Sequence, residues 1–342
     1  MIVVILGAGA TKGASFVKKG LAQIVPPIDD SFFSELQRIR TPLLQPLISQ
    51  VLEDIANLFT PGACPSLERV FTTLEHALRI FDVTTKGDLS DRDLRKIRLR
   101  LFEAIAAAFG ASLVGADGKR LECTYHSDLV KVLQPGDRIL SFNYDCVIDD
   151  ALAKHGSGKW DPRRGYGLAA SNAMPWTPRG RSVDDGIRLY KLHGSLHFRL
   201  RNSLRDSIAL RSNPYASVGK VKLAMIPPEW NKDIDQATFS RLWKKASGAL
   251  RRAQTIVVAG YSFPKTDLLA ETLFRVSVSP GQLTSLIIAN PDSDSQNRAR
   301  SIFARGLNAR TRVLEFVTFA DFVHYYREAG LPGEHDAANG SG

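Results

Sequence analysis

Short apolar runs, bounded by glycine, proline and polar residues, recur along the chain. The first, Ile-Val-Val-Ile-Leu at 2–6, contains no polar position, which is typical of a strand buried on both faces. Several later runs are similarly short and apolar. The predicted strands are 2–6, 138–145, 187–194, 222–228, 255–263, 285–292 and 312–319.

Between many of these runs, apolar residues recur every three or four positions, which is the spacing of one helix face. Phe32, Leu36 and Ile39 show this spacing. Ser66 is a suitable N-cap for a later helix, and Pro65 ends whatever precedes it. The predicted helices are 14–20, 31–59, 66–81, 90–113, 145–155, 238–252, 266–276, 295–305 and 319–329.

The alternation of strands and helices predicts an α/β fold with a doubly wound, Rossmann-like parallel sheet. Residues of about 30–130 show helical patterns and no strand pattern. We therefore expect a single domain over 1–330 that carries this helical insertion. Residues 331–342 are small and polar, and we expect a disordered tail there.

The composition is ordinary for a globular protein, with 44% hydrophobic and 23% charged residues. No apolar run is long enough to span a bilayer, and no basic segment precedes the apolar N-terminal stretch as in a signal peptide. The cysteines Cys64, Cys123 and Cys146 are too few and too scattered for a disulfide framework or a four-thiolate zinc site. These features predict a cytoplasmic protein without a membrane partner.

The net charge is +10, and basic residues gather at 92–100 and around Arg179 and Arg181. Such clusters suit a phosphate-bearing ligand, nucleic acid or an acidic partner. The alternative for 92–100 is a solvated helix face, because Leu94 and Ile97 continue an apolar stripe at helical spacing. No nucleic-acid recognition motif accompanies the charge.

A glycine-rich segment, Gly7 to Gly13, follows the first strand. Glycines between a strand and a helix allow a diphosphate to approach the backbone amides of the helix N-terminus. The spacing is G-x-G-x-x-x-G, which departs from the dinucleotide fingerprint, and "VPPIDD" around Asp29 and Asp30 is a poor second strand. This weakens a hydride-transfer interpretation. The alternative is that the glycines serve only tight packing.

Polar residues also stand at the carboxyl ends of several predicted strands, where ligands collect in doubly wound sheets. Asn143 and Asp145 follow one strand, and His193 follows the next. An imidazole is suited to accept a proton near neutral pH. The structural alternatives are that Asp145 caps the following helix and that His193 is a core residue, with His197 competing for any chemical role.

Taken together, "GAGATKGA", "SFNYDCVIDDAL", "YKLHGSLHF", "VVAGYSFPKTD" and "ANPD" occur in the order seen in SIR2-like, sirtuin-related proteins of bacterial anti-phage systems. The resemblance extends from residue 2 to about 325. It implies a catalytic role for Asn143 and His193, with Asp145 beside them in the nicotinamide and ribose pocket. The NAD-binding positions that it implies are Gly7, Ala8, Gly9, Ala10, Thr11 and Gly13 for the pyrophosphate, and Gly260, Ser262, Asn290 and Asp292 for the adenosine half.

The resemblance implies an NAD+ glycohydrolase that cleaves its substrate to nicotinamide and ADP-ribose. It also implies a homo-oligomer, activated by assembly or by a separate defence protein such as a HerA-like ATPase or an Argonaute-type protein. Deacylating sirtuins carry a four-cysteine zinc module after the histidine strand. Here no cysteine follows Cys146, so we expect no metal and no deacylation.

Two other functions remain open on the sequence. The chain can be a subunit that binds NAD or ADP-ribose for assembly or sensing without cleaving it. Alternatively, its positive charge can serve direct nucleic-acid binding, in which case affinity would fall steeply with salt.

Overall fold

The computed structural model describes residues 1–62, 64–79, 90–171, 176, 185–200, 207–219, 221–227 and 237–329. The basic cluster around Arg179 and Arg181 and the predicted tail at 331–342 lie outside the described residues. No helix within the described ranges is long and apolar enough to cross a membrane.

Six parallel strands form the main sheet, in the order β10-β9-β8-β1-β2-β4. The strands are β1 (Ile2–Leu6), β2 (Arg138–Ser141), β4 (Arg188–Lys191), β8 (Thr255–Ala259), β9 (Ser285–Ala289) and β10 (Arg312–Phe316). The chain builds the sheet outward from β1 in one direction and then, from β8, in the other. This is the strand order of dinucleotide-binding folds, and it confirms the predicted doubly wound, Rossmann-like class.

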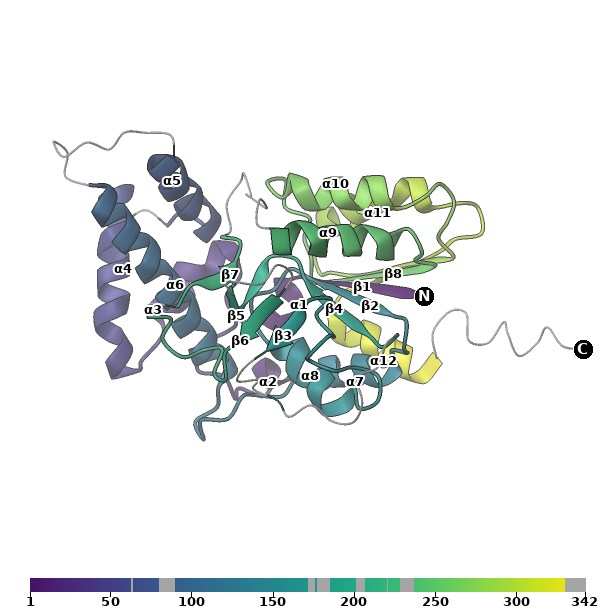
Figure 1. Cartoon of the computed structure of the whole chain (residues 1–342), viewed down its shortest axis with the longest axis horizontal. Helices are drawn as coiled ribbons and strands as arrows, with labels where there is room; N and C mark the ends of the chain where they lie inside the picture. The colour runs from purple at the N-terminus through teal and green to yellow at the C-terminus, as the bar shows by residue number, and fades with distance from the viewer. Residues whose placement is uncertain are drawn as a thin grey trace, which may run out of the picture.

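Helices cover both faces of this sheet, as Figure 1 shows. One face carries α9 (Ala237–Leu250), α10 (Leu268–Ser277) and α11 (Ser293–Phe303), and the other carries α7 (Thr124–Val132), α8 (Val147–His155) and α12 (Phe319–Ala329). The central strands β1, β8 and β9 are buried along almost their whole length because both faces are covered.

A second, four-stranded sheet has the order β3-β6-β5-β7. Its strands are β3 (Ala169–Ser171), β5 (Gly194–Leu200), β6 (Ser207–Leu210) and β7 (Leu223–Met225). The predicted strand at 222–228 is present as β7, but it lies in this second sheet instead of the main sheet, and β3, β5 and β6 were not predicted. The chain passes from β4 of the main sheet into β5 of the second sheet through a sharp turn at Gly194, whose φ is +78°.

Four helices gather at one end of the molecule: α3 (Phe32–Gln37), α4 (Gln45–Leu58), α5 (Leu67–Arg79) and α6 (Asp91–Leu113) (Figure 1). The predicted single helix at 31–59 is divided, because Pro42 starts a 3-10 turn between α3 and α4. On α6, Leu94 and Ile97 are buried, while Arg100 pairs with Asp54 of α4 at 2.6 Å. Within 92–100, these positions fit a helix that packs inward with its charges partly paired.

The start of the chain also differs from the prediction. The expected loop at 7–13 is mostly a short helix, α1 (Ala8–Lys12), and the expected helix at 14–20 is the single turn α2 (Ser15–Lys18). Residues 7–13 pass into helix directly after β1 because Gly7 already stands in the extended N-cap conformation.

Candidate active site

The turn after β1 and the turn after β8 are pressed together at the point where the strand order reverses. The amide of Gly9 donates to the carbonyl of Gly260 at 2.9 Å. A Cβ atom on Gly7 would lie 2.5 Å from the same carbonyl oxygen, and one on Gly260 would collide with the amide nitrogen of Ala10. A Cβ on Gly9 would lie 2.9 Å from that oxygen, so packing alone requires Gly7, Gly9 and Gly260, whereas a Cβ on Gly13 would come no closer than 3.4 Å to its nearest neighbour.

Asn143 follows β2 and reaches back to the glycine turn. Its side-chain Nδ2 donates to the carbonyl of Gly7 at 3.0 Å and to Oγ1 of Thr11 at 3.3 Å. The residue is buried, and its Oδ1 atom has no hydrogen-bond partner among the described residues. A buried amide oxygen without a donor is costly, so this atom is suited to accept a hydrogen bond from a ligand hydroxyl or water.

Asp145 is fully engaged by the protein. One carboxylate oxygen accepts the Thr11 hydroxyl at 2.9 Å, and the other accepts the amide of Val147, at the start of α8, at 3.0 Å. The N-cap of α8 is Cys146, but Asp145, one residue earlier, satisfies the amide of the first helical residue, so its contacts support the structural alternative. The carboxylate holds α1 and α8 in place around Asn143.

His193 lies at the same edge of the sheet as Asn143. β2 and β4 are neighbours, with Ser141 paired to Lys191, and each candidate side chain comes two residues beyond that pair. The ring of Phe142 packs edge-on against His193 at 5.0 Å, and Trp243 of α9 lies at 6.2 Å. The predicted amide and imidazole, which come from distant points in the chain, thus lie just beyond the ends of two adjacent strands.

Asp267, to which the sequence analysis assigned no role, lies against this histidine. One of its carboxylate oxygens is 3.4 Å from Nε2 of His193 and accepts the Tyr261 hydroxyl at 2.8 Å. Asp267 is also the N-cap of α10. A capping signal, Asp before an apolar helix, was present in the sequence, but the fold alone brings it to His193.

The adenosine-side residues make mostly local contacts in the structure. Asn290 donates from Nδ2 to the carbonyl of Tyr261 at 3.2 Å, which ties the end of β9 to the turn after β8. Asp292 caps α11, and the carbonyl of Ser262 accepts from Arg298 at 3.0 Å. Their predicted contacts with NAD remain predictions.

Asp29 is likewise committed to the protein: its carboxylate accepts the amide of Glu68, at the start of α5, at 2.7 Å. This contact gives Asp29 a capping role on the insertion helices. A ribose contact of the dehydrogenase type, already weak on the sequence, gains no support from it.

A family model described as a SIR2-like domain matches residues 137–310, about half of the chain. The matched range includes both Asn143 and His193. This protein belongs to the SIR2-like family. Membership supports an NAD-related function.

Solved structures with similar folds include a Sir2 homologue mutant bound to 2'-O-acetyl ADP ribose, at 13% identity and a TM-score of 0.40, covering 97% of this chain and 94% of that one. A complex described as Sir2, p53 peptide and NAD+ matches at 11% identity and a TM-score of 0.38, covering 96% and 93%. No match was found among curated proteins. Nothing about the substrate of the SIR2-like chain follows from likeness at this level.

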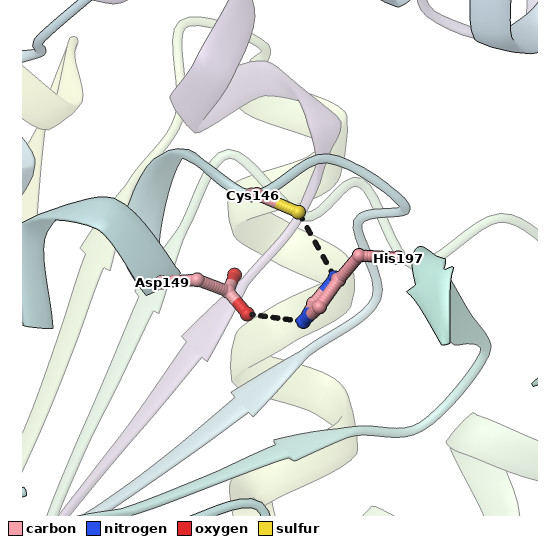
Figure 2. Close-up of side chains that lie close together, drawn as sticks. All are labelled: Cys146, Asp149 and His197. Atoms are coloured by element: carbon pink, nitrogen blue, oxygen red, sulfur yellow. Dashed lines mark hydrogen bonds and ion pairs between the residues drawn. The ribbon is translucent and has the colours of Figure 1, made fainter. Parts of the chain in front are cut away.

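The SIR2-like chain also holds a buried polar cluster formed by Cys146, Asp149 and His197 (Figure 2). The Cys146 sulfur is 3.0 Å from Nδ1 of His197. Nε2 of His197 lies 3.0 Å from the Tyr166 hydroxyl, which also donates to Asp149 at 2.8 Å. His197 is fully buried within this network, so it cannot compete with His193 for substrate.

The electrostatics of the cluster keep its thiol and imidazole neutral. Burial lowers the pKa of His197 to about 3, against an opposing effect of Asp149. Burial, and then the negative charge of Asp149, raise the pKa of the Cys146 thiol well above its ordinary value. Burial is the largest single effect on Lys191 and lowers its pKa, but the combined attraction of Asp149 and the other negative groups around it leaves the pKa raised.

Cys146, Asp149 and His197 are metal-ligand types, with their ligand atoms within 4.8 Å of one another. However, the Lys191 ammonium is 3.1 Å from Asp149, and both ring nitrogens of His197 lie within hydrogen-bond distance of protein groups. A metal ion would have to displace this ammonium and these hydrogen bonds. The donor set therefore fits a satisfied core network better than a metal centre.

Lys191 connects this cluster to the candidate site, because its ammonium also donates to the backbone carbonyl of Asp145. Replacing Lys191 by methionine is expected to lower the free energy of unfolding by about 3–5 kcal/mol, since it leaves the Asp149 carboxylate buried without its partner. Urea unfolding at pH 7 measures this. The double variant K191M/D149L is expected to recover much of the loss, and equal stability of the single and double variants would contradict the account.

The lowered pKa of His197 predicts that the folded protein loses stability in acid. The unfolded chain takes up a proton at this residue near its ordinary pKa of 6.5, whereas the folded protein resists until about pH 3. Stability is therefore full above pH 6.5 and falls by about 1.4 kcal/mol per pH unit as the pH drops below it. Denaturant unfolding between pH 7 and 5 should show one fewer proton taken up in His197→Gln, while His324→Gln, at an exposed histidine, should match the wild type.

Proposed function

We propose that this chain is an NAD+ glycohydrolase that cleaves NAD+ to nicotinamide and ADP-ribose. The observation that carries the proposal is the unpartnered Oδ1 of Asn143, held beside the glycine turn at the same sheet edge as His193. The Asn143 oxygen accepts a hydrogen bond from the ligand or water, and His193 takes a proton. Both residues stand at the sheet edge where doubly wound sheets bind their ligands.

The chemistry asks little of the protein beyond positioning, because nicotinamide leaves as a neutral molecule from a cationic substrate. A water oxygen bonds to the ribose C1' as the bond from C1' to the nicotinamide nitrogen breaks, and that electron pair stays with nicotinamide. His193 accepts the proton that the water loses. Asn143 orients the water or a ribose hydroxyl through Oδ1.

The surrounding side chains support this assignment of roles. Phe142, Tyr144 and Trp243 place aromatic rings within 5.0–6.5 Å of the His193 ring, and they limit its contact with bulk water. Asp145 acts through Thr11 and α8, because both of its carboxylate oxygens are already hydrogen-bonded. We therefore assign Asp145 a supporting role rather than direct contact with nicotinamide.

A second candidate function is binding of NAD or ADP-ribose without cleavage, as an assembly or sensor subunit. It is favoured by the number of predicted site residues, such as Asn290 and Asp292, that already serve local structure. Such residues can shape a pocket without taking part in a reaction.

Free nicotinamide distinguishes the two functions. Purified protein is incubated with NAD+, alone and with candidate partners, and nicotinamide is quantified by chromatography while binding is measured by calorimetry. Release of nicotinamide supports the glycohydrolase. Tight NAD+ binding without release under every condition supports the sensor subunit and contradicts our proposal.

We also propose the biological setting that the sequence resemblance implies. The enzyme acts in anti-phage defence within the cytoplasm, as a homo-oligomer switched on by assembly or by a defence partner such as a HerA-like ATPase or an Argonaute-type protein. Depletion of NAD+ then arrests the infected cell. Salt-sensitive binding to a DNA probe by the isolated chain would instead favour direct nucleic-acid recognition.

A further inference from the structure

We propose that Asp267 is the positioning residue for His193: its carboxylate orients the imidazole and stabilises the imidazolium that forms when the histidine takes a proton. The inference rests on the proposed function and adds a residue to its machinery. The two groups approach within 3.4 Å, although 73 residues separate them in the chain. β4 supplies the histidine, and the segment after β8 supplies the carboxylate.

Capping a helix does not explain the burial of Asp267. Asp292 caps the next helix, α11, with 54% of its side chain exposed, whereas the side chain of Asp267 is 3% exposed. A buried carboxylate is costly unless it is hydrogen-bonded or paired. The Tyr261 hydroxyl, donating at 2.8 Å, supplies part of that compensation, and an imidazolium at 3.4 Å would supply more.

The aromatic rings around the pair fix its geometry. Phe142 stacks on Tyr261 with ring centres 4.4 Å apart and also packs edge-on against His193. The histidine and the tyrosine that holds the carboxylate therefore share one wall. A carboxylate on the Nε2 side of His193 favours the tautomer that carries its proton on that nitrogen.

Among the described residues, the phenols of Tyr144 and Tyr261 face this pair. Tyr144 lies 6.5 Å from the His193 ring and donates its hydroxyl to the carbonyl of Ile226. Burial, followed by the charge of Asp267, raises the pKa of Tyr261 well above its ordinary value, so this phenol stays neutral. The Glu68 carboxylate, which accepts the Thr266 hydroxyl at 2.7 Å, also raises the pKa of Tyr261. Lys191, two residues before the histidine, is committed to Asp149. Asp267 is therefore the carboxylate that lies against the imidazole, 3.4 Å from its Nε2 atom.

The test is the variant Asp267→Asn, which keeps the size and the helix-capping ability of the side chain and removes its charge. The titration of His193 is followed by NMR on histidine-labelled protein without NAD+, with His193→Gln identifying the resonance. Loss of the carboxylate is expected to move the titration of His193 to lower pH by about one unit. Tyr261→Phe keeps the carboxylate and is expected to give a smaller shift.

Activity supplies the second readout. In Asp267→Asn the acidic limb of nicotinamide release should move to lower pH together with the NMR titration, and turnover should fall more than the KM for NAD+ changes. The control is Asp321→Asn, which removes an exposed carboxylate that accepts the amide of Thr318 at the start of α12. An unchanged His193 titration in folded Asp267→Asn would overturn the proposal. A shifted titration in a protein that never releases nicotinamide would uphold the pairing and reject the glycohydrolase.

Discussion

Replacement of His193 by alanine is expected to lower nicotinamide release by about 100- to 10,000-fold, the usual contribution of a general base. In the proposed reaction the imidazole takes the proton from the attacking water, and His193 stands at the same sheet edge as Asn143. The rate of nicotinamide release is expected to fall by a similar factor in Asn143→Ala, because this variant loses the buried oxygen that orients the ribose or the water. Nicotinamide release under activating conditions measures both.

The control for this experiment is His324→Ala, since His324 is an exposed histidine on α12. It should retain the wild-type rate. Thermal unfolding should show that His193→Ala remains folded. Near-full activity in either His193→Ala or Asn143→Ala would reject the assignment of these residues as catalytic.

Gly260→Ala is expected to cost more stability than any other single methyl group added to the two glycine turns. The φ of Gly260 is +61°, where a side chain alone costs about 1–2 kcal/mol, and the new Cβ would also collide with the amide nitrogen of Ala10. The turn after β1 must therefore move away from the turn after β8. We expect a clear drop in the unfolding temperature and loss of NAD+ binding.

Gly13→Ala is the matched control from the same glycine-rich segment. Gly13 has a negative φ, and its added Cβ would approach only the carbonyl of Gly9, at 3.4 Å. Its unfolding temperature should stay close to that of the wild type. If Gly260→Ala and Gly13→Ala were destabilised equally, the close packing of the two turns would not be the reason that glycine is needed at Gly260.

The central strands of the main sheet were predictable because they are buried on both faces, and continuous apolar runs such as 2–6 and 255–259 record that burial directly. Their order was not predictable residue by residue, since every central strand carries the same pattern. The strands β3, β5 and β6 were not predicted. They form through pairing with distant segments rather than through a local pattern.

The candidate site was predictable as a set of strand-end residues, because parallel strands place all their carboxyl ends at one edge. The sequence could not separate His193 from His197, which stand four residues apart in "KLHGSLHF". Gly194 separates them: it turns the chain into β5, which carries His197 into the buried cluster of Figure 2. Asp267 was equally invisible, since its meeting with the histidine depends on the packing of β8 beside β1.

The central claim is that NAD+ lies across the carboxyl ends of the parallel strands, with its nicotinamide ribose between Asn143 and His193. A crystal structure of His193→Ala grown with NAD+ tests this most directly, because the variant should bind the dinucleotide without cleaving it. We predict density for the pyrophosphate beside the turn of Gly7 and Gly260, and for the ribose within hydrogen-bond distance of the Asn143 Oδ1. Dinucleotide density at another site, or none at saturating NAD+, would contradict the account.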